Sequence, residues 1–298
     1  MTRLPLAAAI ALLFSSQAAF SSLPTFSVWP GGEAPGAKNS PASESLVERS
    51  KDPSLPDRAV TGVRAPTITV YAPEKPNGIA LSDLAPVFNA RGYTLFVMTY
   101  RMPADGHAEG SDAPLADAQR ALRTLRARAA EWHIDPHKIG IMGFSAGGHV
   151  AASLETRYSE PAYAAVDAID QQSARPDFAV LGYPVISMDP AIAHPGSRKA
   201  LIGETPTAER QHRYSPEQNV TPQTPPTFIF HAVDDPSVPV DNALVMFNAL
   251  RAHQVPTELH LFAEGKHGFG IRGTRGLPAA EWPQLAMNWI ASLAEMNK

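Results

Sequence analysis

The chain has 298 residues, of which 44% are hydrophobic and 18% charged, with a formal net charge of -4 at pH 7. This composition is too apolar for a disordered chain and supplies enough buried material for one α/β domain near the upper size of a single core. Basic and acidic residues are interleaved, which argues against a nucleic-acid partner. The sequence contains no cysteine, so disulfides, a thiol nucleophile and a thiolate metal site are excluded.

The first residues have the pattern of a secretory signal peptide. Arg3 precedes an apolar run over residues 4–14, and the small residues Ser16 and Ala18 follow where a signal peptidase could cut. A membrane anchor is the alternative, but the run is shorter than the ~20 apolar residues that span a bilayer. We therefore predict a signal peptide over residues 1–21, export to the periplasm or out of the cell, and no membrane association after cleavage.

We predict one domain over residues 22–298. Its first part, about residues 22–64, is predicted to be an irregular segment that runs over the domain. This part is rich in Pro, Gly, Ser and charge and shows neither a helical nor a strand period. Short strands are predicted at 67–71 and 94–100. Between Leu115 and Trp132 the apolar positions step by three and four, which predicts an amphipathic helix.

Strands and helices continue to alternate in the second half of the chain. Residues 139–142 form a predicted buried strand, and residues 146–154 a helix directly after it. The further predicted strands are 178–183, 227–231 and 259–262, and 282–294 is a closing helix. This alternation predicts a mostly parallel central sheet with helices on both faces.

The motif Gly143-Phe144-Ser145-Ala146-Gly147 lies between the predicted strand and helix, which is the context of a nucleophile elbow. A sharp turn there exposes the serine hydroxyl, and the flanking glycines, Gly143 and Gly147, let strand and helix approach each other without side-chain clashes. The backbone N–H of Ala146, at the start of the helix, can donate to an oxyanion. A Gly-rich phosphate loop or an ordinary turn is the alternative interpretation of the motif.

A serine nucleophile needs a histidine as base and a carboxylate to orient that histidine. The strand predicted at 227–231 runs into Asp234 and Asp235, and either could be the acid or a solvated loop residue. His267 lies in a glycine-flanked loop after the last predicted strand, so it can reach the elbow. The order serine, acid, histidine is that of α/β-hydrolases. Metal binding is a weak alternative, because no H-E-x-x-H or comparable cluster of metal ligands is present.

With these residues together, the chain resembles the bacterial α/β-hydrolase esterases that deacylate plant polysaccharides, often labelled acetylxylan esterases or xylanases. The resemblance covers most of the mature chain. Beyond the triad motifs it rests on residues 29–36, 91–93, 100–101, 145–149, 196–198, 201–203 and 215–217. It favours Asp235 over Asp234, because Asp235 begins an Asp-x-x-Val-Pro turn ending at Pro239. It also implies a secreted or periplasmic enzyme without a cofactor.

The chain departs from this family between the strands at 67–71 and 94–100. The family has a further strand there and a Gly-rich loop that gives a second oxyanion N–H. Here only residues 79–81 are apolar before Ser82 and Asp83, which begin a helix ending at Ala90. About 15 to 20 residues are missing by comparison, given the usual lengths of a strand and a loop. A real lineage and a deletion in the gene model both explain the gap.

The predicted function is therefore hydrolysis of short acyl esters, such as acetyl groups, on hemicellulose-type carbohydrate. Ser145 is the predicted nucleophile, His267 the base, Asp235 the acid and Ala146 the oxyanion donor. Two alternatives are a catalytically impaired α/β-hydrolase that lacks its oxyanion loop and a single-domain serine peptidase. The sequence leaves the acyl group, the sugar and the oligomeric state open.

Overall fold

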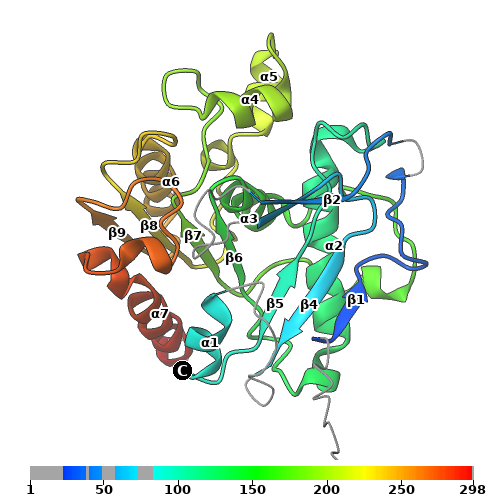
Figure 1. Cartoon of the computed structure of the whole chain (residues 1–298), viewed down its shortest axis with the longest axis horizontal. Coiled ribbons are helices and arrows are strands. Elements are labelled where there is room, and N and C mark those ends of the chain that lie inside the picture. The colour runs from blue at the N-terminus through cyan, green and yellow to red at the C-terminus, as the bar shows by residue number, and fades with distance from the viewer. Residues whose placement is uncertain (1–22, 38–39, 49–57, 73–82, 297–298) are drawn as a thin grey trace, which may run out of the picture.

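A four-stranded parallel sheet forms the centre of the protein (Figure 1). The computed structural model describes residues 23–37, 40–48, 58–72 and 83–296. The sheet has the order β6-β7-β8-β9, with β6 at Ile141–Phe144, β7 at Ala179–Gly182, β8 at Thr227–Ala232 and β9 at Thr257–Phe262. β7 and β8 are buried along their whole length. This burial explains why their sequences are nearly continuous apolar runs rather than alternating ones.

Seven α-helices and six short 3₁₀ turns surround the strands in the described part of the chain. The helices are α1 (Leu84–Asn89), α2 (Ala113–Ala127), α3 (Ala146–Arg157), α4 (Pro195–Ile202), α5 (Ala208–Arg213), α6 (Asp241–Ala252) and α7 (Trp282–Met296). The 3₁₀ turns are η2 (Gly110–Asp112), η3 (Ala129–Trp132), η4 (Ala168–Gln171), η5 (Pro216–Gln218), η6 (Arg272–Thr274) and η7 (Pro278–Glu281).

Helices cover both faces of the parallel sheet, as the sequence predicted. Side chains alternate along a strand, so Val180 and Phe230 pack on one face with residues of α1 and α7. Leu181 and Ile229 point to the other face and pack with residues of α3 and α6. Each face is therefore closed by a different pair of helices, and the carboxyl ends of the strands are left to carry a site.

The N-terminal segment that the sequence predicted to be irregular contains three short strands. β1 (Thr25–Ser27) pairs with β4 (Thr67–Tyr71), and β4 pairs with β5 (Leu95–Met98), both antiparallel. β2 (Ser45–Glu48) and β3 (Arg58–Thr61) form a separate antiparallel pair. Strands of three or four residues are too short to show a period in the sequence, which is why the prediction missed them.

The sheet of β1, β4 and β5 is not hydrogen-bonded to the parallel sheet in the part of the chain that the structure describes. The additional strand that the resembled family has would lie between these two sheets, next to the nucleophile strand. Residues 73–82, on which the predicted gap falls, lie outside the described residues. The absence of a strand and a glycine loop therefore stays a prediction.

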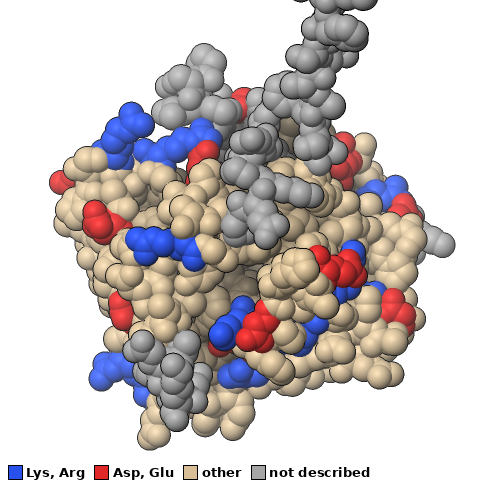
Figure 2. Space-filling model, turned by 90° about the horizontal axis from the view of Figure 1, so that it is seen from below, with Lys and Arg blue, Asp and Glu red and all other residues tan. Residues whose placement is uncertain are grey.

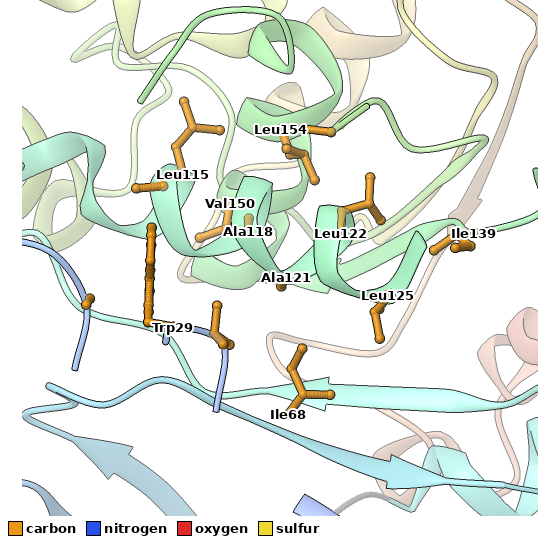
Figure 3. Close-up of a cluster of buried hydrophobic side chains, with 14 of the residues drawn as sticks. Trp29, Ile68, Leu115, Ala118, Ala121, Leu122, Leu125, Ile139, Val150 and Leu154 are labelled. Atoms are coloured by element: carbon orange, nitrogen blue, oxygen red, sulfur yellow. The ribbon is translucent and has the colours of Figure 1, made fainter. Parts of the chain in front are cut away.

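Helix α2 joins the two sheets through a shared apolar core (Figure 3). Its side chains at Leu115, Leu122 and Leu125 pack with Trp29 and Ile68 from the N-terminal half and with residues of α3. The predicted apolar stripe is therefore present. The predicted end at Trp132 is wrong, because the helix ends at Ala127 and a 3₁₀ turn continues to Trp132 before a left-handed residue, His133, at φ 53°.

A fully buried carboxyl group, Glu155, lies on α3 beneath β8. The Thr227 hydroxyl lies 2.8 Å from Glu155 Oε2 and 2.9 Å from the Pro225 carbonyl oxygen, yet it has one proton to donate. Both contacts are satisfied together when Glu155 is protonated and donates to Thr227. Burial raises the pKa of Glu155 to about 8.

We expect Glu155 to make the protein less stable as the pH rises. The folded state keeps the Glu155 proton up to about pH 8, whereas the unfolded chain loses it near the ordinary pKa of a glutamate. The stabilisation is therefore complete below that ordinary pKa and is lost as the pH rises toward 8. The slope should approach ~1.4 kcal/mol per pH unit. In urea unfolding at several pH values, the free energy of unfolding of Glu155→Gln should fall less steeply with pH than that of the wild type, because the glutamine stays neutral. Glu209→Gln, at an exposed position, serves as control, and parallel curves for all three proteins would contradict the prediction.

Candidate active site

Ser145 occupies a strained turn between β6 and α3. Its backbone has φ 52° and ψ -121°, a conformation that non-glycine residues rarely adopt. Gly143 must be glycine, because a Cβ there would lie 2.1 Å from the Gly147 carbonyl oxygen. At Gly147, by contrast, a Cβ would meet only the Tyr100 hydroxyl, at 4.0 Å, whereas at Gly148 it would lie 2.7 Å from Pro184. The close approach of helix and strand therefore depends on Gly143 and Gly148 rather than on both motif glycines.

The structure brings three of the predicted site residues into one hydrogen-bonded chain. The Ser145 Oγ lies 2.8 Å from His267 Nε2, and His267 Nδ1 lies 2.7 Å from Asp235 Oδ2. The three residues come from the ends of β6 and β8 and from the loop after β9. The imidazole is 23% exposed while the Asp235 carboxylate is fully buried, so a ligand can reach the serine end of the chain and not the acid end.

Four donors hold the Asp235 carboxylate. Oδ1 accepts from the backbone N–H groups of Ser237 and Val238, at 2.8 and 2.9 Å. Oδ2 faces His267 Nδ1 at 2.7 Å and His231 Nε2 at 3.2 Å. Burial tends to raise the pKa of Asp235, but the donors from Val238, His267 and Ser237 outweigh it and lower that pKa. The group is thus a fixed anion that accepts from the imidazole.

Asp234, the competing carboxylate in the sequence, points elsewhere. It is exposed, and its Oδ1 accepts a hydrogen bond of 2.8 Å from the backbone N–H of Lys266. That contact anchors the residue next to His267, where the backbone of Lys266 is left-handed with φ 61°. The two adjacent acids therefore make different contacts. Asp235 faces the His267 imidazole, and Asp234 accepts from the backbone of the loop that carries His267.

Two residues at the site were not singled out from the sequence. His231, fully buried at the end of β8, lies against Asp235. Tyr183 contacts His267 edge to face, with ring centroids 5.4 Å apart, and its hydroxyl accepts from the Gly270 N–H at 3.3 Å. The signal for His231 was present in the sequence, since a histidine four residues before the acid can reach it across a tight turn.

Ala146 begins α3, so its backbone N–H is one of the helix-start donors without an intrahelical acceptor. This is the place expected for an oxyanion donor. The loop that would give a second donor falls among residues 73–82, outside the described residues.

The histidine on α3, His149, is a packing residue. It is buried, and it contacts the Tyr214 carbonyl oxygen at 2.8 Å. Burial lowers the pKa of His149 to about 4.

Three further features of the described residues concern metal ligands, membrane-spanning helices and surface charge. No group of three or more His, Asp or Glu side chains there could hold a metal ion. None of the described helices combines the length and the apolar character needed to cross a bilayer. Figure 2 shows basic and acidic side chains interspersed on one face of the molecule.

Comparison with known proteins identifies the family to which the chain belongs. The family model described as BD-FAE matches residues 75–250, which include the elbow, Asp235 and most of the parallel sheet. The chain belongs to the BD-FAE family. The resemblance found in the sequence and the predicted fold class are confirmed by this match together with the structural neighbours below.

Two curated relatives of this BD-FAE protein have informative names. Endo-1,4-beta-xylanase B of Butyrivibrio fibrisolvens is 36% identical over 62% of the chain and 29% of its own length. Acetylxylan esterase of Xylanibacter ruminicola is 33% identical over 69% of the chain and 40% of its own length. The chain thus spans less than half the length of either relative.

A solved structure matches over nearly its full length. The acetyl ester-xyloside bifunctional hydrolase of Caldicellulosiruptor lactoaceticus is 34% identical, with a TM-score of 0.67, over 84% of this chain and 96% of its own. The carboxylesterase Cest-2923 of Lactobacillus plantarum, at 23% identity and a TM-score of 0.61, shares the fold. The described architecture is therefore that of known esterase structures.

Proposed function

We propose that this BD-FAE protein is a serine carboxylic-ester hydrolase. Ser145 Oγ attacks the ester carbonyl carbon while His267 Nε2 takes the hydroxyl proton, and the resulting oxyanion accepts from the Ala146 N–H. His267 then gives the proton to the leaving alcohol, which leaves an acyl group on Ser145. Water, deprotonated by His267, attacks that acyl group, and His267 returns the proton to Ser145 Oγ as the carboxylic acid leaves. Asp235 stabilises the imidazolium in both steps.

The observation that carries this proposal is the uninterrupted hydrogen-bond chain from Ser145 through His267 to Asp235. Its two distances, 2.8 and 2.7 Å, are those of a productive nucleophile, base and acid. The strained backbone of Ser145 gives further support, because such strain persists only where the surrounding structure holds it in place.

The proposed substrates are short acyl esters, such as acetyl groups, on hemicellulose-type carbohydrate. This substrate class follows from relatives named acetylxylan esterase and xylanase and from a structural neighbour named acetyl ester-xyloside bifunctional hydrolase. Export by the predicted signal peptide belongs to the same proposal, since such polymers lie outside the cell. It rests on the sequence pattern of residues 1–21 alone.

Acetate release from acetylated xylan and hydrolysis of p-nitrophenyl acetate test the proposal. We expect both activities in the purified protein and neither above background in Ser145→Ala, which keeps the fold but has no nucleophile. A fluorophosphonate probe should label the wild type at Ser145 and leave the variant unlabelled. Equal rates in the two proteins would refute the assignment, and a folded wild type without activity would favour the impaired-hydrolase alternative.

A further inference from the structure

Tyr183 directly follows β7, the strand between that of the nucleophile and that of the acid (Figure 1). Its backbone is left-handed, with φ 34°, a conformation that non-glycine residues rarely adopt. Both neighbouring strands hold it there. The Tyr183 N–H donates to the Phe230 carbonyl oxygen at 2.7 Å, and the Ser145 N–H donates to the carbonyl oxygen of Gly182 at 3.1 Å. The sheet therefore sets the direction in which the Tyr183 side chain leaves the backbone.

The Tyr183 side chain contacts three residues of the loop that carries the imidazole. Its ring lies edge to face against the His267 ring, with centroids 5.4 Å apart and planes at 71°. The same ring contacts Phe269, at 4.7 Å between centroids, and its hydroxyl accepts a hydrogen bond of 3.3 Å from the Gly270 N–H. Because Tyr183 is only 5% exposed, these contacts are shielded from water.

The loop between β9 and η6 that carries the imidazole is irregular, so no strand or helix sets its conformation. Its backbone is left-handed at Lys266 and at Gly270, with φ 61° and 47°. The Lys266 N–H donates to Asp234. The Gly270 N–H donates to the Tyr183 hydroxyl, and the Gly270 carbonyl oxygen accepts from the Trp282 indole N–H at 2.8 Å. Side chains from elsewhere in the chain therefore fix this loop on both sides of the imidazole.

Two hydrogen bonds do not by themselves fix the orientation of the His267 ring. They meet the ring at Nε2, toward Ser145, and at Nδ1, toward Asp235. The ring can still turn about the line that joins these nitrogens, and the torsion that turns a histidine ring has broad energy wells. A base must be held within roughly 10–20° of its productive orientation. The Tyr183 ring packs against the imidazole from outside that line, so it limits the rotation.

We propose that Tyr183 is a positioning residue for His267: its ring limits the rotation of the imidazole, and its hydroxyl fixes the loop at Gly270. This inference rests on the proposed esterase function and deepens it, because Tyr183 acts on the reaction through His267 without touching the ester. The two contacts can be removed separately, since phenylalanine keeps the ring and lacks the hydroxyl.

Tyr183→Leu and Tyr183→Phe test this role with p-nitrophenyl acetate. Tyr183→Leu lacks both contacts and should lower kcat about tenfold, while KM stays within about twofold of the wild type. Tyr183→Phe lacks only the hydroxyl and should lower kcat about threefold. A second readout is the NMR signal of the His267 Nδ1–H proton, identified by its absence in His267→Gln. It should broaden in Tyr183→Leu, because a loosely held ring exchanges this proton with water faster.

Tyr163→Leu and Tyr163→Phe are matched controls. The Tyr163 ring also packs edge to face on an aromatic ring, that of Trp29 at 4.7 Å between centroids. Its hydroxyl also accepts a hydrogen bond, from the Arg123 side chain at 2.7 Å. These partners lie outside the hydrogen-bonded chain of the site. The control variants should therefore lower the melting temperature and leave kcat and the Nδ1–H signal unchanged.

Two results would overturn the role of Tyr183. One is a kcat for Tyr183→Leu equal to that of Tyr163→Leu, and the other is an Nδ1–H signal as sharp in Tyr183→Leu as in the wild type. Neither result bears on the esterase function, which fails only if the wild type is no more active than Ser145→Ala. In that case the NMR signal still decides whether Tyr183 holds the imidazole.

Discussion

Asp235→Asn should lower kcat for ester hydrolysis by about a thousandfold to ten-thousandfold with little change in KM. The asparagine keeps the shape of the side chain, so the substrate site is unchanged. It removes the negative charge that stabilises the imidazolium, and an amide nitrogen facing His267 Nδ1 favours the wrong tautomer. Steady-state kinetics with p-nitrophenyl acetate, together with the melting temperature of each variant, measure the effect.

Asp234→Asn is the matched control, because it makes the same change at the adjacent residue. An asparagine side-chain oxygen can still accept from the Lys266 N–H, which Asp234 now does at 2.8 Å. We therefore expect activity within a few-fold of wild type. If Asp234→Asn were the inactive variant and Asp235→Asn the active one, the acid would have to be reassigned.

The geometry behind these expectations was only partly predictable from the sequence. The elbow could be predicted because one short motif fixes both the turn and its position between a strand and a helix. The choice between the two acids could not be made from local pattern alone, since both follow the same strand. It depends on backbone N–H groups of Ser237 and Val238 that turn toward Asp235, and the Asp-x-x-Val-Pro resemblance was the indirect sign of that turn.

The fold shows the same division between local pattern and tertiary contact. Apolar runs predicted the buried strands β7 and β8 closely, because burial on both faces requires such runs. The nucleophile strand was predicted at 139–142 but pairs over Ile141–Phe144, since its register is set by β7 rather than by its own residues.

His231 extends the site beyond the three predicted residues. Its Nε2 lies 3.2 Å from Asp235 Oδ2 and 3.0 Å from the Val238 carbonyl oxygen, and two acceptors at one nitrogen require a proton there. Nδ1 is buried and has no hydrogen-bond partner. Burial lowers the pKa of His231, against the opposing effect of Asp235, so the ring is a neutral donor to the carboxylate.

His231→Leu should therefore lower kcat by roughly 10- to 100-fold, the value of a hydrogen bond to a buried charge. With one donor lost, the pKa of Asp235 rises, so the acid limb of the pH–rate profile moves to higher pH. His231→Gln has an amide nitrogen at a similar reach and should restore both the rate and the profile. A role confined to packing would lower the melting temperature in both variants without moving the profile, and that result would remove His231 from the mechanism.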